Sequence, residues 1–310
     1  MNNKPFVVIV GPTASGKTDL SIELAKKFNG EIINADSTQI FKDLDIATNK
    51  ITKKDMQEIP HYLLSTIDVT DSYSVAQFQQ AAREYMHLIW SNNKLPIIVG
   101  GTGLYINALL KNYNFSKDYH IDGFLEMCDA KTNEELWNWL KEVDPDDASL
   151  IPLSNKKRII RSLELYNITK QTKKERNAGN DTFFYDNFFI VGLNPMREEL
   201  YAKINNRVLE LVDKNLFNEI ELAYIKNNKN RQAQALKAIG APEIISYLNN
   251  EISYEQAIEN MQASNRKYAR RQMTWFRNQL SEINWYDFKF EDYNKIKEKI
   301  IQDINILLAK

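Results

Sequence analysis

The stretch that decides the fold is Phe6-Val7-Val8-Ile9-Val10, followed at once by Gly11-Pro12-Thr13-Ala14-Ser15-Gly16-Lys17-Thr18. Five apolar residues predict a buried strand, and the octapeptide has the spacing of a phosphate-binding loop. Its glycines let backbone N–H groups turn toward phosphate oxygens, and the helix that follows adds the positive end of its dipole. Lys17 supplies a mobile positive charge, and the Thr18 hydroxyl is suited to hold Mg²⁺ that the phosphates also bind. We therefore expect a phosphorylated ligand here, with Mg²⁺ as cofactor.

The composition indicates a globular protein that acts away from membranes. A length of 310 residues with 43% hydrophobic content suits one large domain with an insertion, or two modest domains. No apolar run approaches the roughly 20 residues of a membrane helix, and no signal-peptide pattern follows Met1, so we expect a cytoplasmic location and no membrane partner. One cysteine and three scattered histidines argue against disulfides and a zinc site.

The periodicity predicts alternating strands and helices. Apolar runs at 31–35 and 95–99 predict two more strands, and helical spacing of apolar residues appears in 19–28 and 75–91, where Ser74 suits a helix N-cap. A further strand is expected at 188–193. This alternation is typical of an α/β fold with a doubly wound parallel sheet, in which ligands bind at the carboxyl edge.

The pattern changes twice along the chain, and we expect three segments: a P-loop catalytic core over 1–114, an inserted helical subdomain over 115–186, and core completion with a helical C-terminal region over 187–310. Trp137 and Trp139 are expected to be packing anchors of the insertion. Helices are expected at 197–212, 217–226, 242–248 and 254–280. The tail from Ser281 carries no chemistry that the sequence makes visible.

Two segments are strongly basic although the net charge is only −1. Residues 151–180 hold eight basic and two acidic side chains, and residues 261–280 hold five basic and no acidic ones. Such density can mark a surface that binds a polyanion, although a solvated helix face is the commoner explanation for either run alone.

Polar side chains follow the second and third strands. Asp36 follows strand 31–35, where it could be a magnesium ligand, a general base or only a turn residue. The strand at 95–99 ends in Gly100-Gly101-Thr102 and not in an acid, unlike most nucleoside triphosphatases. The sequence is therefore compatible with a protein that binds a phosphate group without hydrolysing it.

These motifs together resemble the tRNA dimethylallyltransferase family. Beyond the phosphate loop, the stretches that carry the resemblance in order and spacing are Asn34-Ala35-Asp36-Ser37 with Gln39, Asp45-Ile46, Pro60-His61, Gly100-Gly101-Thr102, 142–145, 158–164, 191–193 and 268–277. They cover most of the chain and are far more specific than the loop alone.

The resemblance implies transfer of a dimethylallyl group from dimethylallyl diphosphate to N6 of the adenine immediately 3′ of the anticodon in tRNA. It implies that Asp36 is the base, that Thr102 orients the amine and the diphosphate oxygens, and that Lys17 stabilises the leaving group. The adenine would have to leave its stack to reach these residues. The expected partners are the tRNA anticodon stem-loop and the donor, with no obligate protein partner and a monomeric state.

The tRNA-binding residues implied by the resemblance and the basic segments include the catalytic pair and eleven others. They are Asp36, Ser37, Thr38, Gln39, Thr102, Lys157, Arg158, Arg161, Arg266, Lys267, Arg270, Arg271 and Arg277.

Some positions depart from the family pattern. Phe41 stands where tyrosine is common, and the segment 237–243 lacks the usual Gln and Tyr-Lys around Ile239-Gly240, so Lys237 could replace a missing cation.

Three other functions fit parts of the sequence. An adenylate isopentenyltransferase would use the same donor with free AMP or ADP, but a small acceptor does not need so many basic residues. A small-molecule kinase would share the loop, but no lid motif is apparent. A non-catalytic tRNA-binding module would not need Lys17, Thr18, Asp36 and Thr102 together.

Overall fold

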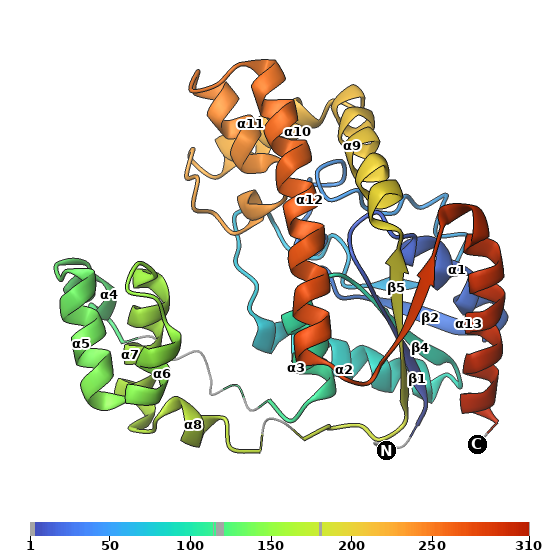
Figure 1. The fold of residues 1–310 in the computed structure, drawn as a ribbon, viewed down its shortest axis with the longest axis horizontal. Coiled ribbons are helices and arrows are strands. Elements are labelled where there is room, and N and C mark those ends of the chain that lie inside the picture. Colours follow the sequence, from blue (N-terminus) through green and yellow to red (C-terminus); the bar gives the residue numbers. More distant parts are fainter. Residues whose placement is uncertain (1–3, 114, 116–120, 180–181, 310) are drawn as a thin grey trace. The chain divides into compact units, whose positions relative to one another are not determined.

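The computed structural model describes residues 4–113, 115, 121–179 and 182–309 (Figure 1). The chain forms two compact units. One contains Met1–Leu110 and Tyr185–Lys310, and the other is Lys111–Phe184.

The first unit is built on a parallel sheet. Within the described residues the strand order is β3-β2-β4-β1-β5-β6, and every neighbouring pair runs parallel. The order places β4 between β1 and β2. The carboxyl ends of these three strands therefore meet at one edge, although 85 residues separate Val10 from Leu95 in the chain. The strands are β1 Phe6–Val10, β2 Gly30–Asn34, β3 His61–Tyr62, β4 Leu95–Val99, β5 Phe188–Pro195 and β6 Ile283–Phe288.

Helices cover both faces of the sheet, which confirms the doubly wound α/β fold (Figure 1). On one face, α1 (Lys17–Lys27) and α13 (Tyr293–Leu308) pack on side chains such as Val7, Ile9 and Val191. On the other face lie α2 (Val75–Ser91) and α3 (Gly103–Leu110). There the ring of Phe6 meets Trp90 of α2 edge-on, with centroids 6.1 Å apart. Alternate residues of β1 thus serve opposite faces.

The sequence predicted most of these elements. The bounds of β1, β4 and α2 are those expected, and Ser74 caps α2 in a capping box with Gln77. Strands β3 and β6 were not predicted. β3 is only two residues long, and β6 mixes polar residues with aromatic ones because it forms an edge of the sheet.

The segment after β5 is mainly helical, as predicted. It contains α9 (Arg197–Asp213), α10 (Leu216–Lys226), α11 (Ala241–Leu248) and the long α12 (Tyr254–Gln279). Helix α12 packs against α9, α11 and α3, so it runs from the helical region to the sheet (Figure 1).

The second unit has its own small core, in which Trp137 and Trp139 pack against a buried apolar cluster, as expected. The indole N–H of Trp137 donates to the carbonyls of Ala148 and Ile151, both at 3.1 Å. Its helices are α4 Phe124–Asp129, α5 Asn133–Val143, α6 Pro145–Leu150, α7 Lys156–Thr169 and α8 Lys173–Arg176.

Across the described parts of both units, no helix combines the length and the apolar character that crossing a membrane requires.

Candidate active site

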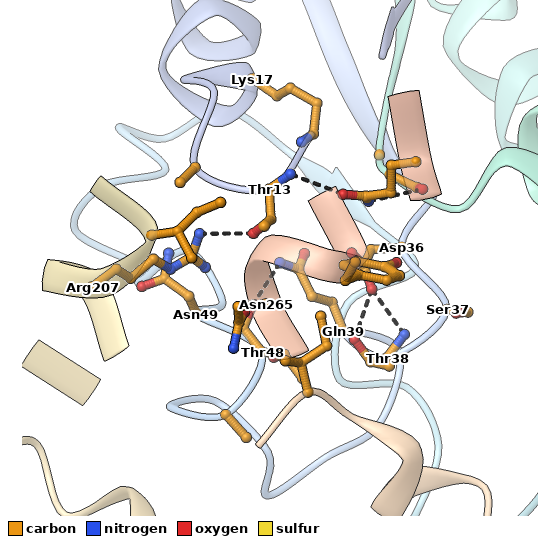
Figure 2. A pocket seen from close by; sticks show the side chains of 18 of the residues that line it. Thr13, Lys17, Asp36, Ser37, Thr38, Gln39, Thr48, Asn49, Arg207 and Asn265 are labelled. Atoms are coloured by element: carbon orange, nitrogen blue, oxygen red, sulfur yellow. Dashed lines mark hydrogen bonds between the residues drawn. The ribbon is translucent and has the colours of Figure 1, made fainter. Parts of the chain in front are cut away.

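A cavity of about 930 Å³ opens at the carboxyl edge of the sheet (Figure 2). Its floor is made by the residues that follow β1, β2 and β4, and its walls come from α9, α12 and the loops around 47–49 and 232–239. Since β4 lies between β1 and β2, Gly100 and Gly101 sit between the phosphate loop and Asp36. A side chain at position 100 is excluded because its Cβ would lie 2.2 Å from the carbonyl oxygen of Ala35.

The phosphate loop leads directly into α1, with Gly16 at φ 93° as the N-cap of this helix, a conformation that favours glycine. Lys17 Nζ donates to the carbonyls of Gly11 (3.0 Å) and Pro12 (2.7 Å), so its charge lies over the loop. Burial lowers the pKa of Lys17 to about 8; the nearby Asp36 carboxylate opposes this shift, and Arg207 adds to it. An anion bound in the loop would favour the charged ammonium.

The loop also offers hydroxyl groups. Ser15 is 1% exposed, and its Oγ has no hydrogen-bond partner among the described residues. Thr18 is exposed in the first turn of α1. No group of three or more acidic, His or Cys side chains that could hold a metal occurs in the described residues. Mg²⁺ usually takes few protein ligands and completes its shell with phosphate oxygens and water, so a Thr18 hydroxyl beside a diphosphate fits this ion.

The two carboxylate oxygens of Asp36 have different surroundings: one holds a turn, and the other is able to accept a proton. Its Oδ1 accepts from the backbone N–H of Thr38 (2.9 Å) and from the Thr38 hydroxyl (2.7 Å), which is the turn expected of an aspartate at this place. No described residue donates to Oδ2. The carboxylate is therefore held in one orientation and retains an oxygen that can take a proton (Figure 2).

Thr102 is fixed beside Asp36 by Ser37. Its hydroxyl oxygen accepts from the backbone N–H of Ser37 at 3.0 Å and donates toward Ser37 Oγ at 3.2 Å. Gln39 Nε2 donates to the carbonyl of Thr48 at 3.0 Å. The structure thus brings together all the residues that the sequence places after β1, β2 and β4.

Arg207 of α9 was not singled out by the sequence. Its Nη1 donates to the Thr13 hydroxyl at 3.2 Å, and Figure 2 shows it reaching the phosphate loop beside Asn49. Burial lowers the pKa of Arg207, with Asp36 opposing the shift, but a guanidinium remains charged. The cavity therefore holds a second fixed cation near the loop.

Helix α12 supplies two more missed residues, Gln272 and Tyr268. Gln272 is buried; its Oε1 accepts from the Thr13 N–H at 2.9 Å, and its Nε2 donates to the Gly101 carbonyl at 3.0 Å. Burial, and then the charge of Asp36, raise the pKa of Tyr268, which keeps its phenol protonated. The helix thus joins the two loops that carry the catalytic candidates.

One wall of the cavity is apolar. It is formed by side chains of α9 together with residues from α10, the 232–239 loop and α12. Lys237 also lines the cavity. A charged floor and an apolar wall suit a ligand with a diphosphate head and a hydrocarbon tail. The apolar lining residues are Ile204, Val208, Leu211, Leu216, Ile239 and Met261.

The wall formed by residues 47–49 is held by Glu219 of α10. The Glu219 carboxylate accepts from three successive backbone N–H groups, those of Asp45 (2.9 Å), Ile46 (2.9 Å) and Ala47 (2.7 Å). A side chain from a distant helix thus helps to fix the position of this loop.

The basic side chains of α12 lie on different sides of the helix. Arg271 lines the main cavity, whereas Arg270 and Arg277 line a second cavity of about 600 Å³ next to the start of α9. Lys267 is exposed, and Arg266 is engaged by Asn205 Oδ1. In the second unit, Lys157 and Arg158 are exposed and Arg161 pairs with Glu164 at 2.7 Å.

The sequence failed to indicate several residues in and around the cavity for one common reason. Arg207, Gln272 and Glu219 sit inside regular amphipathic helices, where sequence spacing predicts only a buried and a solvated face. The one available signal was a polar residue on the buried side of its helix, as at Gln272.

Known proteins resemble this chain over nearly its whole length. The family model described as IPP transferase matches residues 39–279. The tRNA dimethylallyltransferase of Anoxybacillus flavithermus is 42% identical over 281 residues, 91% of this chain and 89% of that protein. That of Macrococcus caseolyticus is 40% identical over 306 residues, 98% of this chain and 97% of that protein.

Solved structures agree. The tRNA isopentenylpyrophosphate transferase of Bacillus halodurans superimposes with a TM-score of 0.75 at 34% identity, covering 100% of this chain and 97% of that one. A eukaryotic dimethylallyltransferase acting on tRNA gives 0.88 at 27% identity, covering 99% of this chain and 80% of that one. The phosphate loop and Asp36 line one cavity, and Thr102 is hydrogen-bonded to Ser37 of its lining. With these features and the similarities above, the chain belongs to the IPP transferase family, a family of transferases.

Proposed function

We propose that this protein transfers a dimethylallyl group from dimethylallyl diphosphate to N6 of the adenine immediately 3′ of the anticodon in tRNA (position 37), forming N6-isopentenyladenosine. The observation that carries this proposal is the single cavity that combines a phosphate loop, an oriented carboxylate and an apolar wall. A kinase would need the loop but not the apolar wall. The relatives named tRNA dimethylallyltransferase support the same reaction.

The donor is held at its two ends. Backbone N–H groups of 11–18 and Lys17 bind the diphosphate, and Arg207, which donates to the Thr13 hydroxyl, adds a second cation near the loop. The hydrocarbon contacts the apolar wall. Fixed cations and N–H groups stabilise the charge that grows on the diphosphate as its C–O bond breaks. Mg²⁺, held on Thr18 and the diphosphate, would supply further positive charge there.

Asp36 acts as the general base. The exocyclic amine of adenine is a weak nucleophile, so its proton must leave as the N–C bond forms, and Oδ2 of Asp36 is available to accept it. Thr102, fixed by Ser37, orients the amine next to this oxygen. The bond that forms is N6–C1, the bond that breaks is C1–O, and diphosphate leaves.

The target adenine has to leave the anticodon stack to enter the cavity, which requires a firm grip on the RNA. Ser37, Thr38 and Gln39 at the cavity floor would contact the flipped nucleotide, and the exposed cations of α7 and α12 would bind phosphates. Arg266 contacts Asn205 and Arg161 pairs with Glu164, so each would exchange this contact for a phosphate oxygen. We further propose that the protein acts as a monomer in the cytoplasm, where its tRNA substrate is found.

Mass spectrometry of the product tests the proposal. The purified protein is incubated with Mg²⁺, labelled dimethylallyl diphosphate and either bulk tRNA or AMP, and separately with ATP and candidate acceptors. A prenylated adenosine in tRNA is the expected result. Prenylated AMP without a tRNA product would identify an adenylate isopentenyltransferase, and a phosphorylated product with ATP would identify a kinase.

A further inference from the structure

The C-terminal helix contacts the phosphate loop through its first residue. The hydroxyl of Tyr293, the first residue of α13, donates to the carbonyl oxygen of Gly16 at 2.8 Å, although 277 residues separate the two. The approach is close, because a Cβ on Gly16 would lie 2.7 Å from the Tyr293 hydroxyl oxygen. Gly16 therefore serves two needs, its positive φ and the room for this tyrosine.

The bond has a direct consequence for ligand binding. In a planar trans peptide the C=O and the following N–H point in opposite directions. The Gly16 carbonyl also accepts the N–H of Leu20 at 3.1 Å, the first hydrogen bond of α1. Because the Gly16 carbonyl and the Lys17 N–H belong to the same peptide plane, two donors that fix the carbonyl also fix the direction of the N–H. This N–H points back into the loop, where the phosphate oxygens would bind.

Other contacts hold the tyrosine itself in place. Its ring stacks on Phe288 of β6 with centroids 5.0 Å apart, and the Lys297 ammonium lies 5.3 Å from its centre. Lys297 in turn pairs with Glu23 (2.8 Å) and Asp19 (3.2 Å) of α1. Contacts to the edge strand β6, within α13 and to the first turns of α1 thus hold the Tyr293 side chain in place.

We propose that Tyr293 is a positioning residue of the diphosphate site, which orients the Gly16–Lys17 peptide so that its N–H meets the donor. This makes α13, in the tail to which the sequence assigns no chemistry, part of the binding apparatus. The inference rests on the proposed diphosphate ligand but not on the identity of the acceptor.

Removing only the hydroxyl group of Tyr293 tests the inference. Tyr293→Phe keeps the ring and its stacking and removes only the bond to Gly16. The matched control is Tyr286→Phe, because the Tyr286 hydroxyl donates to Asp303 Oδ2 of the same helix at 2.7 Å without touching the loop. Binding of inorganic diphosphate with Mg²⁺ is measured by calorimetry for both variants and the parent protein, together with their melting temperatures.

We expect Tyr293→Phe to raise the Kd for diphosphate about 5-fold, the factor that corresponds to one hydrogen bond of ordinary strength. Its KM for dimethylallyl diphosphate should rise similarly, while its KM for tRNA stays unchanged. Tyr286→Phe should bind diphosphate like the parent, even if it melts at a lower temperature.

Two results would overturn the inference: a Tyr293→Phe protein with parental diphosphate affinity, or equal weakening in both variants, which would indicate general support by α13. The outcome is separable from that of the proposed function. A parent protein that binds diphosphate in a Tyr293-dependent way but prenylates no RNA would refute the function and leave the inference standing.

Discussion

Arg207 and Thr13 are joined by a hydrogen bond of 3.2 Å between Nη1 and Oγ1, across 194 residues of sequence. This contact attaches α9 to the phosphate loop and places a guanidinium in the same cavity as the Lys17 ammonium. The phosphate site is therefore defined by two cations, Lys17 and Arg207, as well as by the backbone of the loop.

Replacing Arg207 should impair use of the donor. We expect Arg207→Ala to lower kcat/KM for dimethylallyl diphosphate by about 10²-fold, because a fixed charge near the leaving group is lost. Arg207→Lys should recover part of the lost kcat/KM, because lysine restores the positive charge. Arg197→Ala is the control, since Arg197 lies on the same helix, outside this cavity, over the ring of Tyr201. Steady-state kinetics at saturating tRNA would contradict this role if Arg207→Ala matched the control.

Asp36→Asn should separate catalysis from binding. The amide keeps an oxygen for the two Thr38 hydrogen bonds but cannot accept the adenine proton, so kcat should fall by about 10²-fold or more. The Kd for tRNA, measured by filter binding, should remain close to that of the parent. Normal turnover in this variant would remove Asp36 from the role of base.

Donor affinity should decline at alkaline pH. Because the folded-state pKa of Lys17 is lowered to about 8, the free protein loses this charge as the pH rises through 8, and a diphosphate binds the charged form more tightly. The KM for dimethylallyl diphosphate should therefore be constant from about pH 7 to 7.5, where the terminal phosphate with its pKa near 6 is already ionised, and rise above pH 8. A KM that stays flat to pH 9.5 would show that Lys17 remains charged in the free protein.

Arg270 and Arg271 should act on RNA affinity. Each substitution by alanine should weaken tRNA binding and reduce the slope of log K against log salt by about 1, because one phosphate contact is lost. The control is Lys295→Ala on α13, an exposed lysine that pairs with Asp292 in its own turn. If both arginine variants keep the parental slope, these side chains are merely solvated.

Glu219→Gln should loosen the wall around Ala47. An amide has one acceptor oxygen where the carboxylate has two, so the three N–H groups of 45–47 lose part of a charge-assisted contact. We expect a loss of about 1.5–3 kcal/mol in the free energy of unfolding, measured in urea. Glu221→Gln, two residues along on the exposed side of α10, should leave stability unchanged. Equal stability of both variants would show that the loop does not depend on Glu219.

Much of the fold could be predicted because its signals are local. The run 6–10, the octapeptide 11–18 and the helix that follows are adjacent in the chain, and periodicity predicted α2, α9 and α12 to within a few residues. The strands β3 and β6 were missed because β3 is only two residues long and β6 mixes polar with aromatic residues, so neither shows a clear apolar pattern. The sequence also placed Asp36 and Thr102 at strand ends, since Asp36 directly follows the apolar run 31–35 and Thr102 follows the run 95–99 after two glycines.

The sequence by itself determined the chemistry at the ends of β1, β2 and β4, because a strand, its turn and its terminal side chains are set by neighbouring residues. Only the tertiary structure decided that β4 separates β1 from β2, and that Arg207, Gln272 and Tyr293 reach the phosphate loop from three helices. Such contacts span roughly 200 residues or more, and they arise from how whole helices pack on the sheet, which no local pattern encodes.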